Sequence, residues 1–260
     1  MNRCWTTGAW VLAAVCALPG SGGNRATRGA APEESPSSSQ ADRALRVGNL
    51  PVQKVLFLGN SITLHGPAPS IGWTGNWGMA ASSSDRDYVH LLAQQLSAAA
   101  GGKPDVLVAN IAEFERQYEN YDVDGQLRQQ LEFAADVVIV AIGENVPALA
   151  TNDAQQRFRV CFERLLAALQ RQGRAVLFVR SSFWPEPVKD AIMQEACCAA
   201  GGVFVDIRAL GGVEANAARS ERHFEHAGVA AHPGDQGMKA IAAALWTAIQ
   251  QRALGTTRDE

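Results

Sequence analysis

The chain has 260 residues, of which 23 are Lys or Arg and 26 are Asp or Glu, giving a formal net charge of −3. Neither sign forms a long run, so the sequence has no basic footprint for nucleic acid, and we predict no nucleic-acid partner. Hydrophobic residues make up 47% of the chain, which is enough to bury the core of one domain of about 200 residues.

The first 23 residues have the pattern of a secretory signal peptide. A single basic residue, Arg3, precedes an apolar run over residues 9–18, and a stretch of Pro, Gly and Ser follows. The run is too short to cross a bilayer as a helix, which takes ~20 apolar residues, so we predict no stable membrane span. We expect cleavage within residues 20–26 and export of the mature chain; a lipid anchor through Cys16 is the alternative.

The next segment, residues 24–49, is rich in Ser, Pro, Glu, Ala and Arg and includes "APEESPSSSQADRA". It has too few apolar groups to offset the entropy cost of ordering, so we predict a disordered linker. The folded domain is expected over residues 50–254, and residues 255–260 are a short tail.

Within the domain, five apolar runs of strand length alternate with helical patterns. The runs are nearly continuous in Val, Leu, Ile and Phe, as parallel strands buried on both faces should be. They span residues 54–58, 105–109, 136–142, 175–179 and 203–206, and the helical patterns span 88–100, 125–134, 153–171, 188–200 and 236–252. This alternation predicts an α/β fold with a five-stranded parallel sheet between helices on both faces.

Three polar residues stand where such a fold binds its ligands, beyond the carboxyl ends of the strands. Ser61 follows the first strand, Asn145 follows the third, and His232 precedes the last helix. A nucleophilic serine needs a base and donors for the oxyanion, which His and a side-chain amide can supply. Taken singly, each residue also fits a local turn or cap. The G-x-S-x-G elbow and the P-loop are both absent around Ser61.

Taken together, "LGNSIT", "IGEN" and "HPGDQGMKAIA" resemble the first, third and fifth blocks of the SGNH (GDSL-like) hydrolase superfamily, over roughly residues 52–248. The resemblance implies a flavodoxin-like three-layer α/β/α fold and a serine esterase without a cofactor, often a deacetylase of carbohydrates. It implies that Ser61 attacks the ester carbonyl and that His232 takes its proton. The Ser61 N–H and Asn145 would then stabilise the oxyanion.

The chain departs from that pattern around the first and second blocks. Asn60 stands where the family usually has Asp just before the serine, a mainly supportive position. The glycine of the second block normally gives an oxyanion N–H, and Glu115 lies near its place here. A backbone N–H is available from any residue except proline, so Glu115 remains a candidate donor, with Gly78 as its rival.

The third departure concerns the acid that orients the histidine. The family places it three residues before the histidine, where this chain has Val229. Either His232 works in a Ser–His dyad oriented by a backbone carbonyl, or a carboxylate such as Glu225 or Glu144 arrives from elsewhere. Because an acid fixes the imidazole tautomer and stabilises the imidazolium, we expect slower but real turnover without it.

A long insert between Ser61 and the first helix carries Trp73 and Trp77 among several glycines. These tryptophans either form a sugar-stacking wall over the acyl pocket or anchor a self-packed loop on the rim of the sheet. Trp184, after the fourth strand, either faces the same cleft or packs in the core. We also take Glu144 as a candidate substrate contact.

Polar and sulfur-bearing side chains elsewhere admit two readings each. Glu113, Glu115 and Arg116 contact either substrate or solvent, and His65 either lines the site or has a structural role. His223, Glu225 and His226 could hold zinc with His232, but we predict no metal because His232 has a better assignment. Cys161, Cys197 and Cys198 are expected to be helix thiols, or Cys161 pairs with one of the other two.

The sequence therefore predicts an exported serine esterase that acts on an ester, in particular an O-acyl group on a carbohydrate. The alternative within enzymes is an O-acyltransferase that uses Ser61 and His232 with a sugar hydroxyl in place of water. The alternative from another class is a non-catalytic carbohydrate-binding protein on a degenerate hydrolase fold, to which the Val229 position points.

Overall fold

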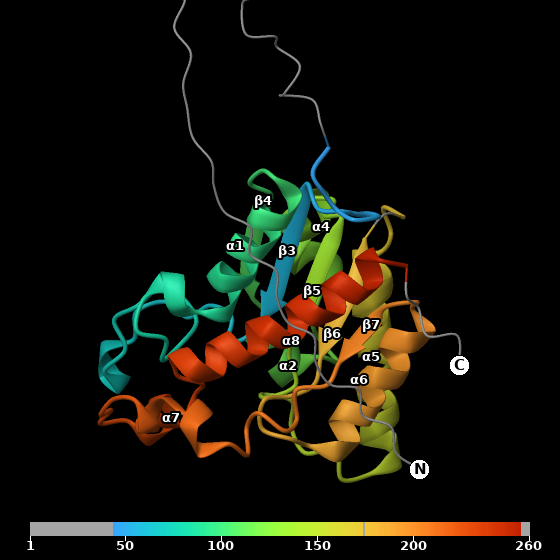
Figure 1. Ribbon diagram of the computed structural model, residues 1–260. Helices are drawn as coiled ribbons and strands as arrows, with labels where there is room; N and C mark the ends of the chain where they lie inside the picture. The colour runs from blue at the N-terminus through green and yellow to red at the C-terminus, as the bar shows by residue number, and fades with distance from the viewer. Residues whose placement is uncertain (1–43, 174, 256–260) are drawn as a thin grey trace, which may run out of the picture. The chain divides into compact units, whose positions relative to one another are not determined.

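The computed structural model describes residues 44–173 and 175–255 (Figure 1). They belong to one compact unit, Arg43–Glu260. The predicted signal peptide, residues 24–43 of the predicted linker and all but the first residue of the predicted tail lie outside the described residues.

The core of the unit is one parallel sheet, as predicted. Its strands are β3 (Lys54–Gly59), β4 (Asp105–Asn110), β5 (Val137–Ala141), β6 (Val176–Arg180) and β7 (Val203–Val205). They are ordered β4-β3-β5-β6-β7, and every neighbouring pair is parallel. In chain order this is 2-1-3-4-5, the flavodoxin-like order, in which the crevice for ligands opens beyond the carboxyl end of the first strand.

Helices cover both faces of the sheet, which confirms the predicted α/β class (Figure 1). One face packs against α1 (Tyr88–Ala100) and α8 (Asp235–Ala253), and the other packs against α5 (Asn152–Leu169) and α6 (Pro187–Ala199). Alternate residues of each strand enter the two cores, so that Phe57 faces α1 and α8 while Leu58 faces α5. Both strand faces are therefore apolar, which explains the continuous hydrophobic runs.

The short elements are those that hydrophobic periodicity does not reveal. The helix predicted over residues 125–134 is two short helices, α3 (Val123–Gln126) and α4 (Arg128–Glu132), and α2 (Ala112–Gln117) and α7 (Ala227–Ala231) occupy segments read as loops. The described residues also contain four 3-10 turns: η1 (Pro69–Ile71), η2 (Ser84–Arg86), η3 (Glu214–Asn216) and η4 (Ala218–Ser220). None of these short helices and 3-10 turns spans two full helical turns, so none has enough residues to show an amphipathic stripe.

A two-stranded hairpin, β1 (Arg46–Val47) and β2 (Leu50–Pro51), leads into β3. Its apolar residues Val47 and Leu50 are buried in the core on the α1 and α8 face. Residues 44–49, expected in the linker, are thus part of the packed unit.

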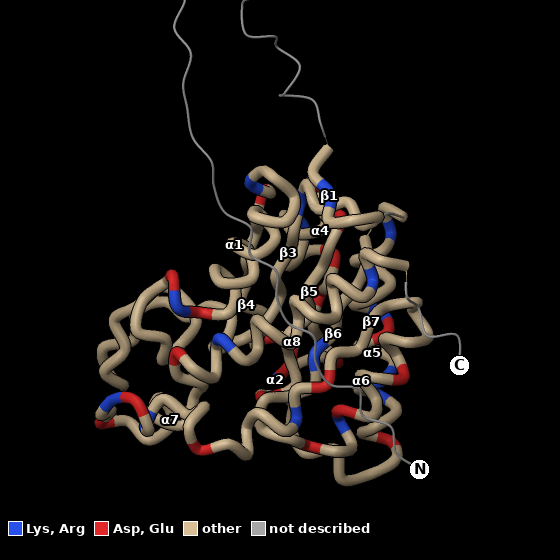
Figure 2. Tube along the Cα trace, in the orientation of Figure 1, with Lys and Arg blue, Asp and Glu red and all other residues tan. Residues whose placement is uncertain are grey.

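Two further features bear on the predicted partners. No helix within residues 44–173 and 175–255 is long and apolar enough to cross a membrane. Figure 2 shows basic and acidic residues interspersed along the trace.

The thiols of Cys161, Cys197 and Cys198 are all free, so the alternative of a disulfide is not realised.

Candidate active site

Ser61 and His232 meet beyond the carboxyl end of β3. Ser61 lies two residues after that strand, and His232 directly follows α7 as its C-cap, three positions before α8 begins. The Ser61 Oγ lies 2.8 Å from the His232 Nε2, although the two residues are 171 positions apart in the chain. This is hydrogen-bond distance for a nucleophile and its base.

A backbone carbonyl orients the imidazole. The His232 Nδ1 lies 2.7 Å from the Gly228 oxygen. A carbonyl only accepts, so Nδ1 carries the proton and the Nε2 of the neutral ring is left to accept from the Ser61 hydroxyl. No carboxylate among the described residues lies within ion-pair distance of His232. The Glu144 side chain is 3% exposed and paired with Arg180, so it is not the orienting acid.

The surroundings keep His232 neutral. Burial lowers the pKa of His232 below its ordinary value, and the hydrogen bond to the Gly228 carbonyl offsets part of that effect. The ring of Trp184 meets the imidazole edge-on, with centroids 5.3 Å apart. Trp184 is 37% exposed and contacts the base, so it is not packed in the core, although it is not among the residues that line the cleft.

The insert packs on itself and on α7. The Trp73 Nε1–H donates to the His65 oxygen (3.0 Å), and the two indoles of Trp73 and Trp77 pack edge to face with centroids 5.6 Å apart. Trp73 is 6% exposed and shares a buried cluster with Val229 of α7. Its indole therefore has no free face for a sugar, so the expected contact of Trp73 with substrate is wrong. Trp73 instead anchors the loop, which was the alternative interpretation.

Trp77 also serves the insert rather than an open wall. Its Nε1–H donates to the Ala81 oxygen (3.0 Å), and its backbone pairs with His65. Figure 1 shows the insert beside α7, and the guanidinium of Arg222, which precedes α7 in the chain, donates to the Ala80 oxygen of the insert. Through Val229, the insert supports the turn that carries the Gly228 carbonyl.

The two backbone groups proposed as second oxyanion donors are engaged elsewhere. The Gly78 N–H donates to the Asp87 Oδ2 (3.0 Å). Glu115 is the fourth residue of α2, so its N–H lies past the free donors of the first turn. By contrast, the Ser61 N–H has no protein acceptor among the described residues, and it stays the available backbone donor.

The Glu115 side chain, rather than its backbone, contributes to the site by accepting hydrogen bonds from the residues around it. Its carboxylate is fully buried and accepts four hydrogen bonds. Oε1 accepts from the Gly143 N–H (2.7 Å), the Asn145 N–H (3.1 Å) and the Asn60 Nδ2 (3.2 Å), and Oε2 accepts from the Asn145 Nδ2 (2.7 Å). Burial and the nearby Glu144 raise the pKa of Glu115.

Glu144 extends this buried network to β6. Its carboxylate accepts from the Arg180 Nη1 (2.6 Å), the Phe183 N–H (2.8 Å) and the Asn60 Nδ2 (2.7 Å). Burial opposes its ionisation, but the Arg180 guanidinium outweighs that effect and lowers the pKa of Glu144. Glu144 is therefore a structural anion beneath the site, which corrects its expected contact with substrate.

The network explains why Asn60 replaces the usual Asp. Its amide nitrogen donates to two carboxylates, those of Glu115 and Glu144, while its Oδ1 accepts from the Ile62 N–H (3.1 Å). An Asp could accept from Ile62 but could not donate to either carboxylate. The residue before Ser61 is thus matched to the two acids around it.

A cleft of about 420 Å³ opens at Ser61 and His232. Its walls combine polar side chains with a few apolar ones: Ser61, His65, Ile71, Met79, Asn110, Ala112, Glu113, Arg116, His226, Gly228, Val229 and His232. Glu113, Arg116 and His65 thus line the cleft, whereas Glu115 is fully buried and, like Asn145, is not among the lining residues. The volume suits a small molecule.

The structure places the remaining candidates as follows. No group of three or more His, Cys, Asp or Glu side chains in the described part of the chain is arranged to hold a metal. His226 instead caps α7, where its Nδ1 accepts from the Val229 N–H (3.4 Å).

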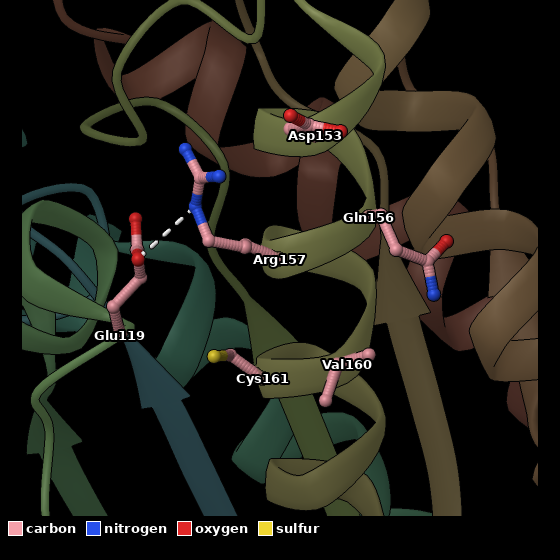
Figure 3. Close-up of a pocket in the computed structure, with 6 residues that line it drawn as sticks. All are labelled: Glu119, Asp153, Gln156, Arg157, Val160 and Cys161. Atoms are coloured by element: carbon pink, nitrogen blue, oxygen red, sulfur yellow. Dashed lines mark ion pairs between the residues drawn. The ribbon is translucent and has the colours of Figure 1, made fainter.

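A second cavity, of about 430 Å³, lies along α5 (Figure 3). Arg157 points toward Glu119 there and forms an ion pair of 3.1 Å, beside the Cys161 thiol. Burial raises the pKa of Cys161, which makes the thiol a poor nucleophile. This cavity contains none of the residues of the Ser61 cleft.

Sequence reasoning missed Arg180 and Gly228. A signal for Arg180 was available, because a charged residue ends a strand that is otherwise apolar and buried. No sequence signal marked Gly228, because its contribution is a carbonyl that every residue has.

Comparisons with known proteins place this chain in a family. The family model described as GDSL-like Lipase/Acylhydrolase family matches residues 57–240, more than half of the chain. No curated protein matches.

Among solved structures, the chain is similar to a protein from Parabacteroides merdae assigned as a GDSL-like lipase, with 18% identity, 82% of this chain and 100% of that chain covered, and a TM-score of 0.49. It is also similar to a family two carbohydrate esterase from Clostridium thermocellum in complex with cellohexaose, with 17% identity, 78% and 65% covered, and a TM-score of 0.49. The match of the family model carries the assignment: the chain belongs to the GDSL-like lipase/acylhydrolase family and is a hydrolase of ester bonds.

Proposed function

We propose that the protein is a serine esterase that removes a small O-acyl group, in particular acetyl, from a carbohydrate. The observation that carries the proposal is the 2.8 Å contact between Ser61 Oγ and His232 Nε2, with Nδ1 held by the Gly228 carbonyl. This arrangement supports a dyad in which a neutral imidazole is poised to take the serine proton.

The chemistry follows from these positions. His232 takes the Ser61 proton as Oγ forms a bond to the ester carbonyl carbon, and the carbonyl oxygen becomes an oxyanion. The Ser61 N–H and the Asn145 Nδ2 donate to that oxyanion. Collapse breaks the ester C–O bond, and the imidazolium returns its proton to the departing alcohol. Water, deprotonated by His232, then attacks the acyl-serine. The acyl–Oγ bond breaks, the imidazolium returns its proton to Ser61 Oγ, and the acid is released.

The carbohydrate part of the proposal rests on the walls of the cleft. Asn110, Glu113 and Arg116 place donors and acceptors beside Ser61, which suits a substrate rich in hydroxyls. The apolar part of the cleft is limited to a few side chains, among them Ile71 and Met79. A volume of about 420 Å³ divided in this way favours a short acyl group over a long chain.

Release of acetate from acetylated oligosaccharides tests the proposal. Wild type is compared with Ser61→Ala, and with Ser97→Ala as a matched control, since the Ser97 hydroxyl donates to the Ala93 oxygen inside α1. We expect turnover by wild type and Ser97→Ala and its loss in Ser61→Ala. Equal rates for wild type and Ser61→Ala would refute the esterase mechanism.

The same assay separates the alternatives. Adding a sugar acceptor and analysing the products detects acyl transfer. A serine-reactive phosphonate that labels wild type but not Ser61→Ala supports a catalytic serine over a non-catalytic binding protein.

We also propose that the protein is exported, on the pattern of residues 1–23. Expression of the full chain with sequencing of the mature N-terminus tests this. Cleavage within residues 20–26 is the expected outcome, and an intact Met1 on all of the protein would contradict it.

A further inference from the structure

Two neighbouring residues of α2 hold the Asn145 amide from both ends. The Asn145 Nδ2 donates to the Glu115 Oε2 (2.7 Å), and the Asn145 Oδ1 accepts from the Arg116 Nη2 (3.3 Å). The Asn145 backbone N–H also donates to Glu115 (3.1 Å). Both the main chain and the side chain of Asn145 are therefore tied to one carboxylate.

The chemistry of the two partners determines which way the amide faces. Both oxygens of Glu115 face N–H donors and a guanidinium only donates, so Nδ2 faces Glu115 and Oδ1 faces Arg116. Turning the amide over would set two donors against each other at Arg116 and two acceptors against each other at Glu115. One Nδ2–H is used by Glu115, and the second has no protein acceptor among the described residues.

The Glu115 carboxylate, which holds the Asn145 amide, is itself fixed in place. Glu115 has no exposed surface, and the Gly143 N–H and the Asn60 Nδ2 occupy its Oε1. Asn60 is the neighbour of Ser61, so one buried carboxylate joins the residue before the nucleophile to the amide after β5. Gly143 has a φ of 125°, and a side chain there would meet the Ser182 Oγ at 2.4 Å, so this turn accepts only glycine.

We propose that Glu115 and Arg116 are positioning residues that lock the Asn145 amide so that its second Nδ2–H points at the oxyanion. The proposal rests on the proposed esterase function and deepens it, because it assigns a role to the buried Glu115 and a second role to Arg116, which also lines the cleft. A donor fixed before the reaction needs no reorganisation when the oxyanion forms, which is the condition under which such donors are most effective.

Glu115→Gln is the variant that tests this. Gln keeps the shape and the Oε1 acceptor, but it puts an NH₂ group opposite the Asn145 Nδ2. Two NH₂ groups then face each other at position 115, so the Asn145 amide is no longer held in place and its donor to the oxyanion is misplaced. Because this donor acts on the transition state, kcat should fall by about 10²–10³-fold, as for the loss of one oxyanion donor, with KM little changed.

A double-mutant cycle with Asn145→Ala separates positioning from a structural effect. If Glu115 acts through Asn145, the variant Glu115→Gln/Asn145→Ala has the kcat of Asn145→Ala alone, within about twofold. If Glu115→Gln lowers kcat by the same factor in both backgrounds, the proposal is overturned. An unchanged kcat in Asn145→Ala also overturns it, whereas the esterase function stands or falls separately with Ser61→Ala.

Two further variants guard against misfolding. Asp136→Asn is the matched control, because Asp136 is a buried carboxylate that accepts the Lys54 N–H (2.9 Å) at the opposite end of the sheet. Its kcat should stay at the wild-type value. If Glu115→Gln does not fold, the partly exposed Arg116→Met replaces it in the cycle. Its smaller loss of kcat must vanish in the Asn145→Ala background, and persistence there contradicts the proposal.

Discussion

Changing Asn60 to Asp would place a third carboxylate in the buried network while restoring the residue that the SGNH pattern has at this position. The Asn60 Nδ2 lies 2.7 Å from Glu144 Oε2 and 3.2 Å from Glu115 Oε1. An aspartate oxygen at those distances loses both hydrogen bonds and faces two acids. Like charges this close cannot all ionise, so the cluster of the Asn60→Asp variant must take up a proton.

The expected cost follows from that proton. Holding an acid of ordinary pKa ~3.9 in its neutral form costs about 1.4 kcal/mol per pH unit above that value, hence about 4 kcal/mol at pH 7 and about 1.5 kcal/mol at pH 5. The folded variant binds more protons than its unfolded chain, so its stability falls as the pH rises. The deficit against wild type is therefore largest at neutral pH and shrinks on acidification.

Urea unfolding of wild type and Asn60→Asp at pH 7 and pH 5 measures this deficit at each pH. We expect it to be smaller at pH 5 by about 2.7 kcal/mol. Asn110→Asp is the matched control, since the Asn110 amide donates to the Leu64 oxygen on an exposed part of the chain (2.7 Å). The reasoning is refuted if the deficit of Asn60→Asp is absent at pH 7 or is the same at both pH values.

Two other predictions concern the base and the insert. Because burial lowers the pKa of His232, the ring stays neutral below its ordinary pKa of ~6.5, so kcat/KM should fall only at a pH lower than that; an acid limb centred above 6.5 in a pH–rate profile would contradict this. Trp73→Ala should destabilise the fold by about 3–5 kcal/mol in urea unfolding, because Trp73 is buried against Val229. A raised KM with unchanged stability would instead indicate a sugar-stacking role for Trp73.

The elements that the sequence predicted well are those whose signal is local. Apolar runs predict the five strands, and helical periodicity predicts the long helices. The helix α1 spans Tyr88–Ala100 as expected, with Asp87 as its N-cap and Gly101 as its C-cap. The short helices α2 and α7 were missed for the same reason, since six and five residues carry no periodic stripe. Ser61, Asn145 and His232 were candidates because each stands at the end of a strand or the start of a helix and the three together match the SGNH pattern, and the structure brings Ser61 and His232 within 2.8 Å of each other.

Hydrogen-bond partners distant in the chain were decided only by the tertiary structure. The role of Glu115 depends on Asn60, 55 positions away, and the orientation of His232 depends on a carbonyl that no side chain marks. The insert likewise revealed its tryptophans as loop anchors only once Trp73 was seen against Val229. Apolar patterning is a property of neighbouring residues and can be read along the chain, whereas a buried acid takes its role from donors that folding brings to it.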